Sequence, residues 1–295
     1  MQNVKLINYL HLHLLVLIAG FTAILGELIS LEATPLVWYR MTIAGLLMFI
    51  FIKLKKISLK VPLRAIARFS IAGIIIALHW ITFFAAIKVA NISIALAMFS
   101  TGAFFASFIE PLFYKRKIIG YEIIFGCIVI IGIVLITQAE LKYILGIALG
   151  ITSALFSTLF AVLNGKFVEH YKPSVISFYE FVSGVIFISI FIAFTGNGFD
   201  KTYFQLSNSD WLYVFILASI CTAYAFIASV HVMKHITPYT LVLTYNIEPI
   251  YGILLALLLF PETETMQPMF YIGAALIIST VLLNAVFKNI NKLKI

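Results

Sequence analysis

Charged residues are scarce in this chain of 295 residues, since Asp, Glu, Lys and Arg together make up 11% of it. Ordinary soluble domains carry about 25% charged and about 45–50% apolar residues. Here 63% of the residues are hydrophobic and the mean hydropathy is +1.10. A soluble core does not need so much apolar sequence, so we predict a protein that crosses a membrane many times. The longest polar stretch, Gly196 to Ser209, is too short to fold as a soluble domain.

Cysteine and the common catalytic signatures are also nearly absent. The two cysteines, Cys127 and Cys221, lie inside apolar segments, so we predict no disulfide framework, no metal site and no cofactor. The sequence contains no Gly-x-x-x-x-Gly-Lys loop, which argues against an ATP-driven motor. It also lacks Gly-x-Ser-x-Gly and His-Glu-x-x-His motifs, and we therefore do not expect an enzyme.

Long apolar segments are what the sequence does contain. We count ten, each near the roughly 20 residues that a helix needs to cross a bilayer, which predicts an all-α polytopic membrane protein. The first could be a signal peptide, but it has no small-residue cleavage site and another segment follows at once. The predicted spans are residues 9–29, 34–52, 66–88, 91–113, 118–137, 143–165, 173–195, 210–232, 237–260 and 267–287.

Lys and Arg gather on one side of these spans. With the N-terminus inside, the inner segments hold 16 of the 20 basic residues and the outer segments hold 3, while Arg40 lies within a span. This asymmetry predicts that both termini are cytoplasmic, in a bacterial inner membrane. It also explains the net charge of +8 without a nucleic-acid partner. Residues 53–65 form a basic, amphipathic stretch that is typical of contact with anionic lipid.

The two halves of the chain resemble each other. Residues Phe113–Gly126 match Phe260–Gly273 at an offset of 147. We therefore predict two units of five spans, residues 1–141 and 142–295. Because five is odd, the second unit enters the membrane from the opposite side, and the repeat is inverted. Inverted repeats around a site near the bilayer midplane are typical of transporters.

The stretch Thr237–Phe260 is the most informative of the predicted spans. Glu248 would sit about 16 Å along this helix, near the midplane, where a carboxylate costs about 2.5–3.5 kcal/mol on insertion scales. Pro249 removes a backbone donor beside it, and Gly252 follows one turn later. The repeat places Glu248-Pro249 over Thr101-Gly102, and paired interruptions point to a binding site. Glu248 could instead be a structural carboxylate that caps backbone groups or pairs with a neighbour.

Several motifs together resemble those of the EamA family in the drug/metabolite transporter superfamily, and they span nearly the whole chain. The resemblance implies a secondary carrier, often an exporter of amino acids, metabolites or drugs, with a central cavity lined by both repeats. This chain departs from the family pattern after the fourth span, where Lys115-Arg116-Lys117 replaces an acidic ending. The motifs are Pro35-Leu-Val-Trp-Tyr-Arg40, Glu110-Pro111-Leu, Glu248-Pro249-Ile-Tyr-Gly252, Phe260-Pro-Glu262 and Tyr271-Ile-Gly273.

Further polar residues within the spans are candidates for substrate or coupling-ion contacts. Arg40 could bind an anion, or it could pair with a carboxylate such as Glu27. His79 could relay protons or be a hydrogen-bonded structural group, and Trp80 beside it could line the cavity or belong to an aromatic belt. Small polar residues at helical spacing usually serve helix packing. In addition to Glu248, the candidate residues are Arg40, His79, Trp80, Thr101, Asn164, Tyr179, Glu180, Tyr245 and Asn246.

The leading hypothesis is a secondary transporter of small metabolites, such as amino acids, or amphipathic drug-like solutes, and the family resemblance favours export over import. Its partners would be a small-molecule substrate, the lipid bilayer and a coupling ion such as the proton. The first alternative is a membrane-embedded enzyme that uses Glu248 or Glu180 with His79 as an acid–base pair. A second is a scaffold or sensor that tolerates Glu248→Gln without loss of activity.

Overall fold

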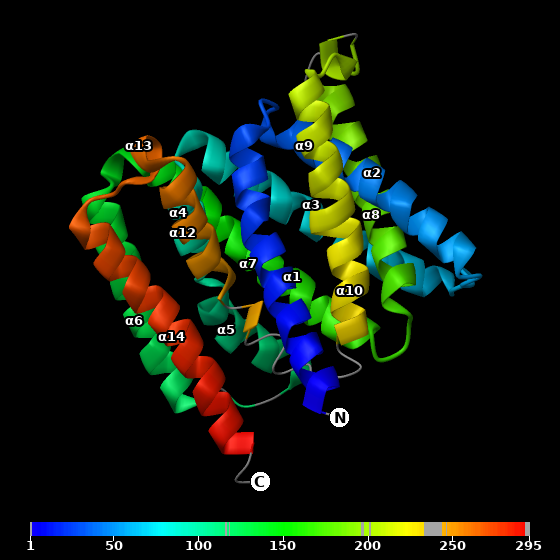
Figure 1. Ribbon diagram of the computed structural model, residues 1–295. Coiled ribbons are helices and arrows are strands. Elements are labelled where there is room, and N and C mark those ends of the chain that lie inside the picture. Colours follow the sequence, from blue (N-terminus) through cyan, green and yellow to red (C-terminus); the bar gives the residue numbers. More distant parts are fainter. Residues whose placement is uncertain are drawn as a thin grey trace.

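The computed structural model of the protein describes residues 2–115, 117, 119–195, 198–200, 202–232, 244, 245 and 247–292. All the regular elements in these residues are helices. In chain order they are α1 (Gln2–Leu28), α2 (Ala33–Leu54), α3 (Leu63–Val89), α4 (Ile92–Phe99), α5 (Gly102–Tyr114), α6 (Gly120–Ala139), η1 (Leu141–Tyr143), α7 (Ile144–Phe167), α8 (Pro173–Thr195), η2 (Thr202–Phe204), α9 (Asn208–Ala218), η3 (Ser219–Tyr224), α10 (Ala225–Val232), α12 (Glu248–Leu259), α13 (Pro261–Glu264) and α14 (Pro268–Lys292) (Figure 1).

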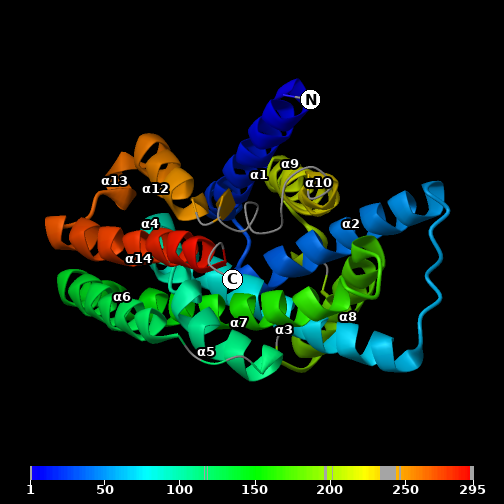
Figure 2. The ribbon, with the colours of Figure 1, turned by 90° about the horizontal axis from the view of Figure 1, so that it is seen from below.

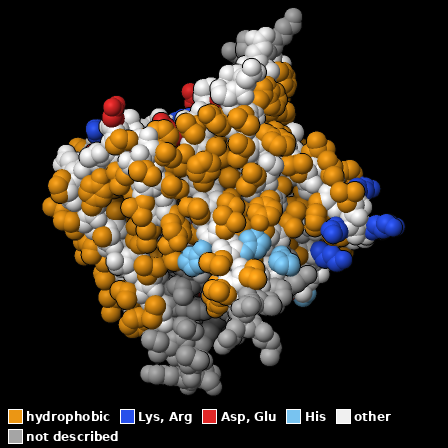
Figure 3. Space-filling model, viewed as in Figure 1, with side chains coloured by type: hydrophobic (Ala, Val, Ile, Leu, Met, Phe, Trp, Pro, Cys, Tyr) orange, Lys and Arg blue, Asp and Glu red, His pale blue; other side chains and the backbone are white. Residues whose placement is uncertain are grey.

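Eight segments in the described part of the chain are helical, long and apolar enough to cross a membrane. They correspond to the first eight predicted spans, and two shorter apolar helices follow at Glu248–Leu259 and Pro268–Asn284. Hydrophobic side chains cover the visible face (Figure 3), as expected of a surface that contacts lipid. The protein is therefore an integral membrane protein. The count of ten spans stays a prediction, and residues 237–243 of the predicted ninth span lie outside the described residues.

The fourth segment is interrupted in its middle. Helix α4 ends at Phe99, and α5 begins at Gly102. The hydroxyl of Thr101 donates to the carbonyl of Met98 at 2.6 Å, and the backbone N–H of Thr101 donates to the same oxygen at 3.0 Å, so a tight turn ends α4 here. The interruption that we predicted at Thr101-Gly102 is thus confirmed.

Small residues let the helices approach closely at two crossings. A Cβ atom placed on Gly73 of α3 would lie 2.3 Å from the carbonyl oxygen of Glu180 on α8, so only glycine fits there. Where α1 meets α12, a Cβ on Gly20 would lie 3.0 Å from the backbone nitrogen of Gly252. Both crossings bring the backbone of one half of the chain against the other, as small residues commonly do in membrane helices.

The pairs of neighbouring helices recur between the two halves. The third span of the first half, α3, packs on α7, the first helix of the second half. In the same way the third span of the second half, α9 with α10, packs on α1, the first helix of the first half. Likewise α1 packs on α12, and α7 packs on α4 and α5. Helices α6 and α14, the last of each half, lie side by side in Figures 1 and 2. This pattern agrees with a chain that is built from two repeats.

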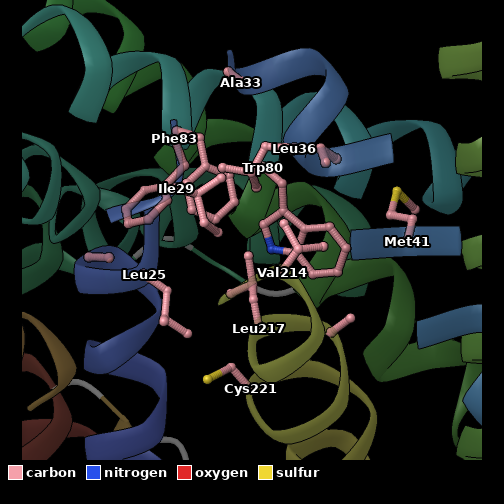
Figure 4. Close-up of a cluster of buried hydrophobic side chains, with 14 of the residues drawn as sticks. Leu25, Ile29, Ala33, Leu36, Met41, Trp80, Phe83, Val214, Leu217 and Cys221 are labelled. Atoms are coloured by element: carbon pink, nitrogen blue, oxygen red, sulfur yellow. The ribbon is translucent and has the colours of Figure 1, made fainter. Parts of the chain in front are cut away.

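The largest buried hydrophobic cluster joins helices from both halves. Leu25, Leu36, Trp80 and Val214 come from α1, α2, α3 and α9, and each is at most 6% exposed (Figure 4). The side chain of Cys221 in η3 lies at the edge of the same cluster. This packing holds α2, α3 and α9 together around Arg40. Among the described residues, Arg40 is the most deeply buried Lys or Arg.

Candidate functional site

Arg40 of α2 lies inside the helical bundle, where it contacts residues of η3 and α3. It is 3% exposed, and its Nε donates to the hydroxyl of Thr222 at 2.9 Å. Its guanidinium carbon lies 3.9 Å from the ring centroid of Trp80 on α3, within the range of a cation–π contact. The ring of Phe84 lies beyond, at 5.7 Å. Glu27, the example that we gave of a possible carboxylate partner, is not among these contacts of Arg40.

The Nη1 atom of Arg40 is buried and has no hydrogen-bond partner among the residues that the structure describes. Leaving a charged donor unsatisfied in a buried place is costly. The contacts with Thr222 and Trp80 fix the plane of the guanidinium, so Nη1 is a donor that is already oriented for an acceptor. This arrangement can bind an anionic or carbonyl oxygen.

Thr222, which accepts the hydrogen bond from Arg40, lies in a distorted part of its helix. Residues Ser219–Tyr224 form a π-helix between α9 and α10, and the Thr222 hydroxyl donates to the carbonyl of Leu217, five residues back, at 2.8 Å. Such π-bulges occur frequently at functional sites. Our reading of the sequence missed Thr222, and neither proline nor glycine in this segment signals the distortion.

Glu248 lies at a helix start, directly after a turn at Ile247. It is the first residue of α12, which Pro249 continues at a position where proline fits without losing a hydrogen bond. The N-terminus of a helix favours a negative charge, so this place stabilises the carboxylate. Glu248 is half-buried, and its charge and that of Arg40 lie close enough to interact. The structure thus brings Arg40, Trp80 and Glu248 into one region.

His79, next to Trp80 in the chain, bonds across to α7. Its Nδ1 lies 3.0 Å from the carbonyl oxygen and 2.9 Å from the hydroxyl of Ser153. The imidazole stacks on Phe99, the last residue of α4, with 5.4 Å between the ring centroids. These contacts fit the structural reading of His79, and they also place the ring beside the interruption between α4 and α5.

Glu180 and Asn164 form a second buried polar pair. The side-chain amide of Asn164 donates to Oε1 of Glu180 at 2.8 Å. Glu180 is 0% exposed, and its Oε2 has no hydrogen-bond partner among the described residues. Burying a carboxylate with one oxygen unsatisfied costs free energy, so this pair can accept another proton or donor.

The remaining candidates make local contacts. The hydroxyl of Tyr179 donates to the carbonyl of Leu59 at 2.9 Å, in the connection between α2 and α3. The hydroxyls of Tyr245 and Ser229 lie 2.9 Å apart. The hydroxyl of Thr101 donates to the carbonyl of Met98, three residues back in the chain. Asn246 lies outside the described residues. The structure therefore does not bring Tyr179, Tyr245 or Thr101 into hydrogen-bond contact with Arg40 or Glu248.

Sequence reasoning also missed two buried acidic residues, Glu264 on α13 and Asp210 in the first turn of α9. Helix α13 lies at the end of the molecule opposite the N-terminal end of α1 (Figure 1). Both oxygens of Glu264 accept backbone N–H groups, from Ile92 at 2.9 Å and from Ser93 at 2.8 Å. Glu264 thereby caps the start of α4 from the connection between α12 and α14. Burial raises the pKa of the Glu264 carboxyl, and these hydrogen bonds partly oppose that rise. Asp210 binds Ser30 and Ser207 in a similar way.

In the described residues the protein is a bundle of membrane-type helices around a buried polar centre, an arrangement that is common among polytopic transport proteins. The model of the EamA-like transporter family matches this chain twice, at residues 6–138 and 144–286. The chain therefore belongs to the EamA-like transporter family.

The protein was also compared with solved structures and with curated proteins. A solved crystal structure resembles the protein with a TM-score of 0.64 at 15% identity, over 94% of this chain and 97% of that chain. This likeness concerns the fold alone. No curated protein matches the sequence.

Proposed function

We propose that the protein is a secondary transporter that exports small metabolites, such as amino acids or amphipathic drug-like solutes, across a bacterial inner membrane. Ten spans would form two inverted five-helix repeats, with both termini in the cytoplasm. Alternating access would occur around a central cavity at the level of Glu248. The family supports the transporter class, and the asymmetry of Lys and Arg supports the orientation.

One observation carries the proposal. Helix α4, the first part of the interrupted segment in the first half, packs against α12, the helix of the second half that begins at Glu248. A Cβ atom placed on Gly252 of α12 would lie 2.3 Å from Leu96 of α4, so these helices touch. Paired broken helices at the interface of two repeats are where secondary transporters bind substrate and coupling ions.

The charges in this region give the residues their proposed roles. Arg40 offers a free, oriented donor to a carboxylate or carbonyl of the substrate. Glu248 would bind an ammonium group of the substrate or a proton as coupling ion, with Trp80 and His79 on the wall. Tyr245, Asn246, Thr101, Asn164, Tyr179 and Glu180 complete the candidate set as residues that contact the substrate or adjust the helices that do.

A membrane-embedded enzyme is the less favoured alternative. It requires His79 and a carboxylate to act as a pair, but His79 bonds to Ser153 and Glu180 bonds to Asn164. Family membership favours transport.

The test is a flux assay in proteoliposomes with an imposed pH gradient, using a panel of labelled amino acids and cationic dyes. We expect the wild type to move at least one of these solutes faster than protein-free vesicles. Glu248→Gln should lower that flux by at least about tenfold, which corresponds to about 1.4 kcal/mol. The matched control is Glu262→Gln, because Glu262 is an exposed carboxylate in α13. Normal flux in Glu248→Gln at every pH would contradict the role of Glu248.

A further inference from the structure

A surface pocket lies at the end of α2, away from the polar centre. It has a volume of about 420 Å³, within the size range of small-molecule sites, which is about 300–1,000 Å³. Its walls come from the last turn of α2, from the chain that leads back to α3, and from Tyr179 on α8. The pocket therefore joins segments that are more than a hundred residues apart in the sequence.

The pocket has a floor and a rim of different character. Residues 57–61 run without helical structure, and their side chains alternate in exposure. Ile57, Leu59 and Val61 are half-buried and form an apolar floor, while Ser58 and Lys60 are exposed at the rim. The hydroxyl of Tyr179 donates to the carbonyl of Leu59 at 2.9 Å, which fixes this segment against α8.

The rim is strongly basic. Lys53 and Lys60 both line the pocket, and Lys55, Lys56 and Arg64 are exposed close by in the chain. Residues 33–109 contain neither Asp nor Glu, so no acidic neighbour in this stretch of sequence neutralises these charges. In Figure 3 the Lys and Arg side chains gather beside the hydrophobic surface at the end of the molecule where α2 meets the connection to α3. A pocket of this kind attracts an anionic group.

The surroundings indicate that the anion is part of a lipid. Leu54 is 77% exposed and Leu63 is 80% exposed, at the two ends of the connection that carries the pocket. Such exposed leucines at the ends of membrane-spanning helices are stable when they face lipid. A ligand with a phosphate and an attached apolar part would satisfy both the lysine rim and the apolar floor, whereas inorganic phosphate would leave the floor uncovered.

We propose that this pocket binds the headgroup of an anionic phospholipid, with the phosphate at Lys53 and Lys60 and the glycerol and first methylene groups on Ile57, Leu59 and Val61. Basic pockets at helix ends are suited to such headgroups, because each lysine near the membrane surface adds to the attraction. The pocket shares Tyr179 with the candidate transport set, but none of Arg40, Glu248 and Trp80 lines it, and the lysines proposed to bind the phosphate are not part of that set.

The test is binding of short-chain phosphatidylglycerol to the full-length protein in detergent, measured by native mass spectrometry and by titration. We expect one binding site, and we expect Lys53→Gln/Lys60→Gln to weaken binding by at least about tenfold, since both lysines proposed to contact the phosphate are removed. Lys55→Gln/Lys56→Gln is the matched control. It removes the same charge from the same connection but does not touch the pocket, so we expect a change below about threefold.

A third variant separates shape from charge. Ser58→Trp keeps every lysine and places a large ring in the pocket from an exposed position, and we expect it to abolish binding. Thermal unfolding of each variant checks that it folds. Equal losses in the two lysine variants would show an attraction by charge alone and would overturn the proposal. Equally tight binding of short-chain phosphatidylcholine would overturn it too, and equally tight binding of inorganic phosphate would identify a free-anion site instead of a lipid site.

Discussion

Glu180 on α8 and Glu264 on α13 are both buried carboxylates, at 0% and 1% exposure, but their oxygens are satisfied differently. Each oxygen of Glu264 accepts a backbone N–H, from Ile92 and from Ser93. In Glu180 only Oε1 has a recorded partner, the amide of Asn164, while Oε2 is buried without one among the described residues. Burial alone therefore does not tell which of the two is structural.

The difference in hydrogen bonding suggests different roles. A carboxylate whose two oxygens bind backbone donors holds two segments in one arrangement, so Glu264 joins the connection after α12 to the start of α4. A half-satisfied carboxylate costs free energy in the folded state and is tolerated where it can take up a proton or change its partner. We therefore expect Glu264 to matter chiefly for stability and Glu180 chiefly for activity.

The largest effect should come from removing the satisfied carboxylate. Glu264→Ala leaves the N–H groups of Ile92 and Ser93 without acceptors at a buried helix start, and we expect a loss of about 2–4 kcal/mol. Thermal unfolding in detergent measures this. Glu262→Ala, an exposed neighbour, should change stability by less than about 0.5 kcal/mol. Equal unfolding temperatures for the two variants would show that Glu264 does not hold these segments together.

The backbone that carries Glu180 can be tested next. Gly73→Ala would place a methyl group 2.3 Å from the carbonyl oxygen of Glu180, which forces α3 and α8 apart. Overpacking of this kind costs about 1–3 kcal/mol, and a lowered unfolding temperature would reveal it. Gly120→Ala is the control, because a Cβ there meets nothing within 4 Å. A Gly73→Ala protein as stable as the control would show that this crossing is not tight.

Removing the charge of Glu180 while keeping its shape separates stability from activity. In Glu180→Gln the amide of Asn164 can still donate to the remaining oxygen, so the unfolding free energy should change by less than about 1 kcal/mol. Flux in proteoliposomes should fall by at least about tenfold, or about 1.4 kcal/mol, if the carboxylate must take up or release a proton. An unchanged flux would make Glu180 a packing residue and would remove the contrast with Glu264.

The smallest effect concerns pH. Burial raises the pKa of Glu264 above its ordinary value of 4.5, so the folded protein binds this proton more tightly than the unfolded chain. The part of the stability that comes from this tighter proton binding is then fully present below pH 4.5 and is lost as the pH rises through the raised pKa of the folded state, while the two backbone hydrogen bonds to the carboxyl group remain. Unfolding temperatures of the wild type should therefore fall over this range relative to those of Glu264→Gln. Parallel curves for the two proteins would contradict the raised pKa.

Hydropathy and charge along the chain were sufficient to predict the membrane class and the positions of eight spans, because each span needs only its own apolar residues. The repeat predicted the interruption at Thr101, and the motifs predicted the family that the comparison confirms. The candidates Arg40, Glu180 and Glu248 could be named from sequence because a charge within an apolar segment is conspicuous.

What surrounds these charges was decided by the tertiary structure. Thr222 lies 182 residues from Arg40 in the chain, and nothing in the sequence signals this contact, which it makes from the π-helical segment η3. Glu264 is 1% exposed, whereas Glu262 beside it is exposed, although both follow the same proline in a polar turn. Hydropathy is a local property, whereas a hydrogen-bond partner depends on which distant segments meet in space. The sequence alone therefore determined which apolar segments carry a charged residue. Only the packing of the helices decided which of these charged groups have hydrogen-bond partners.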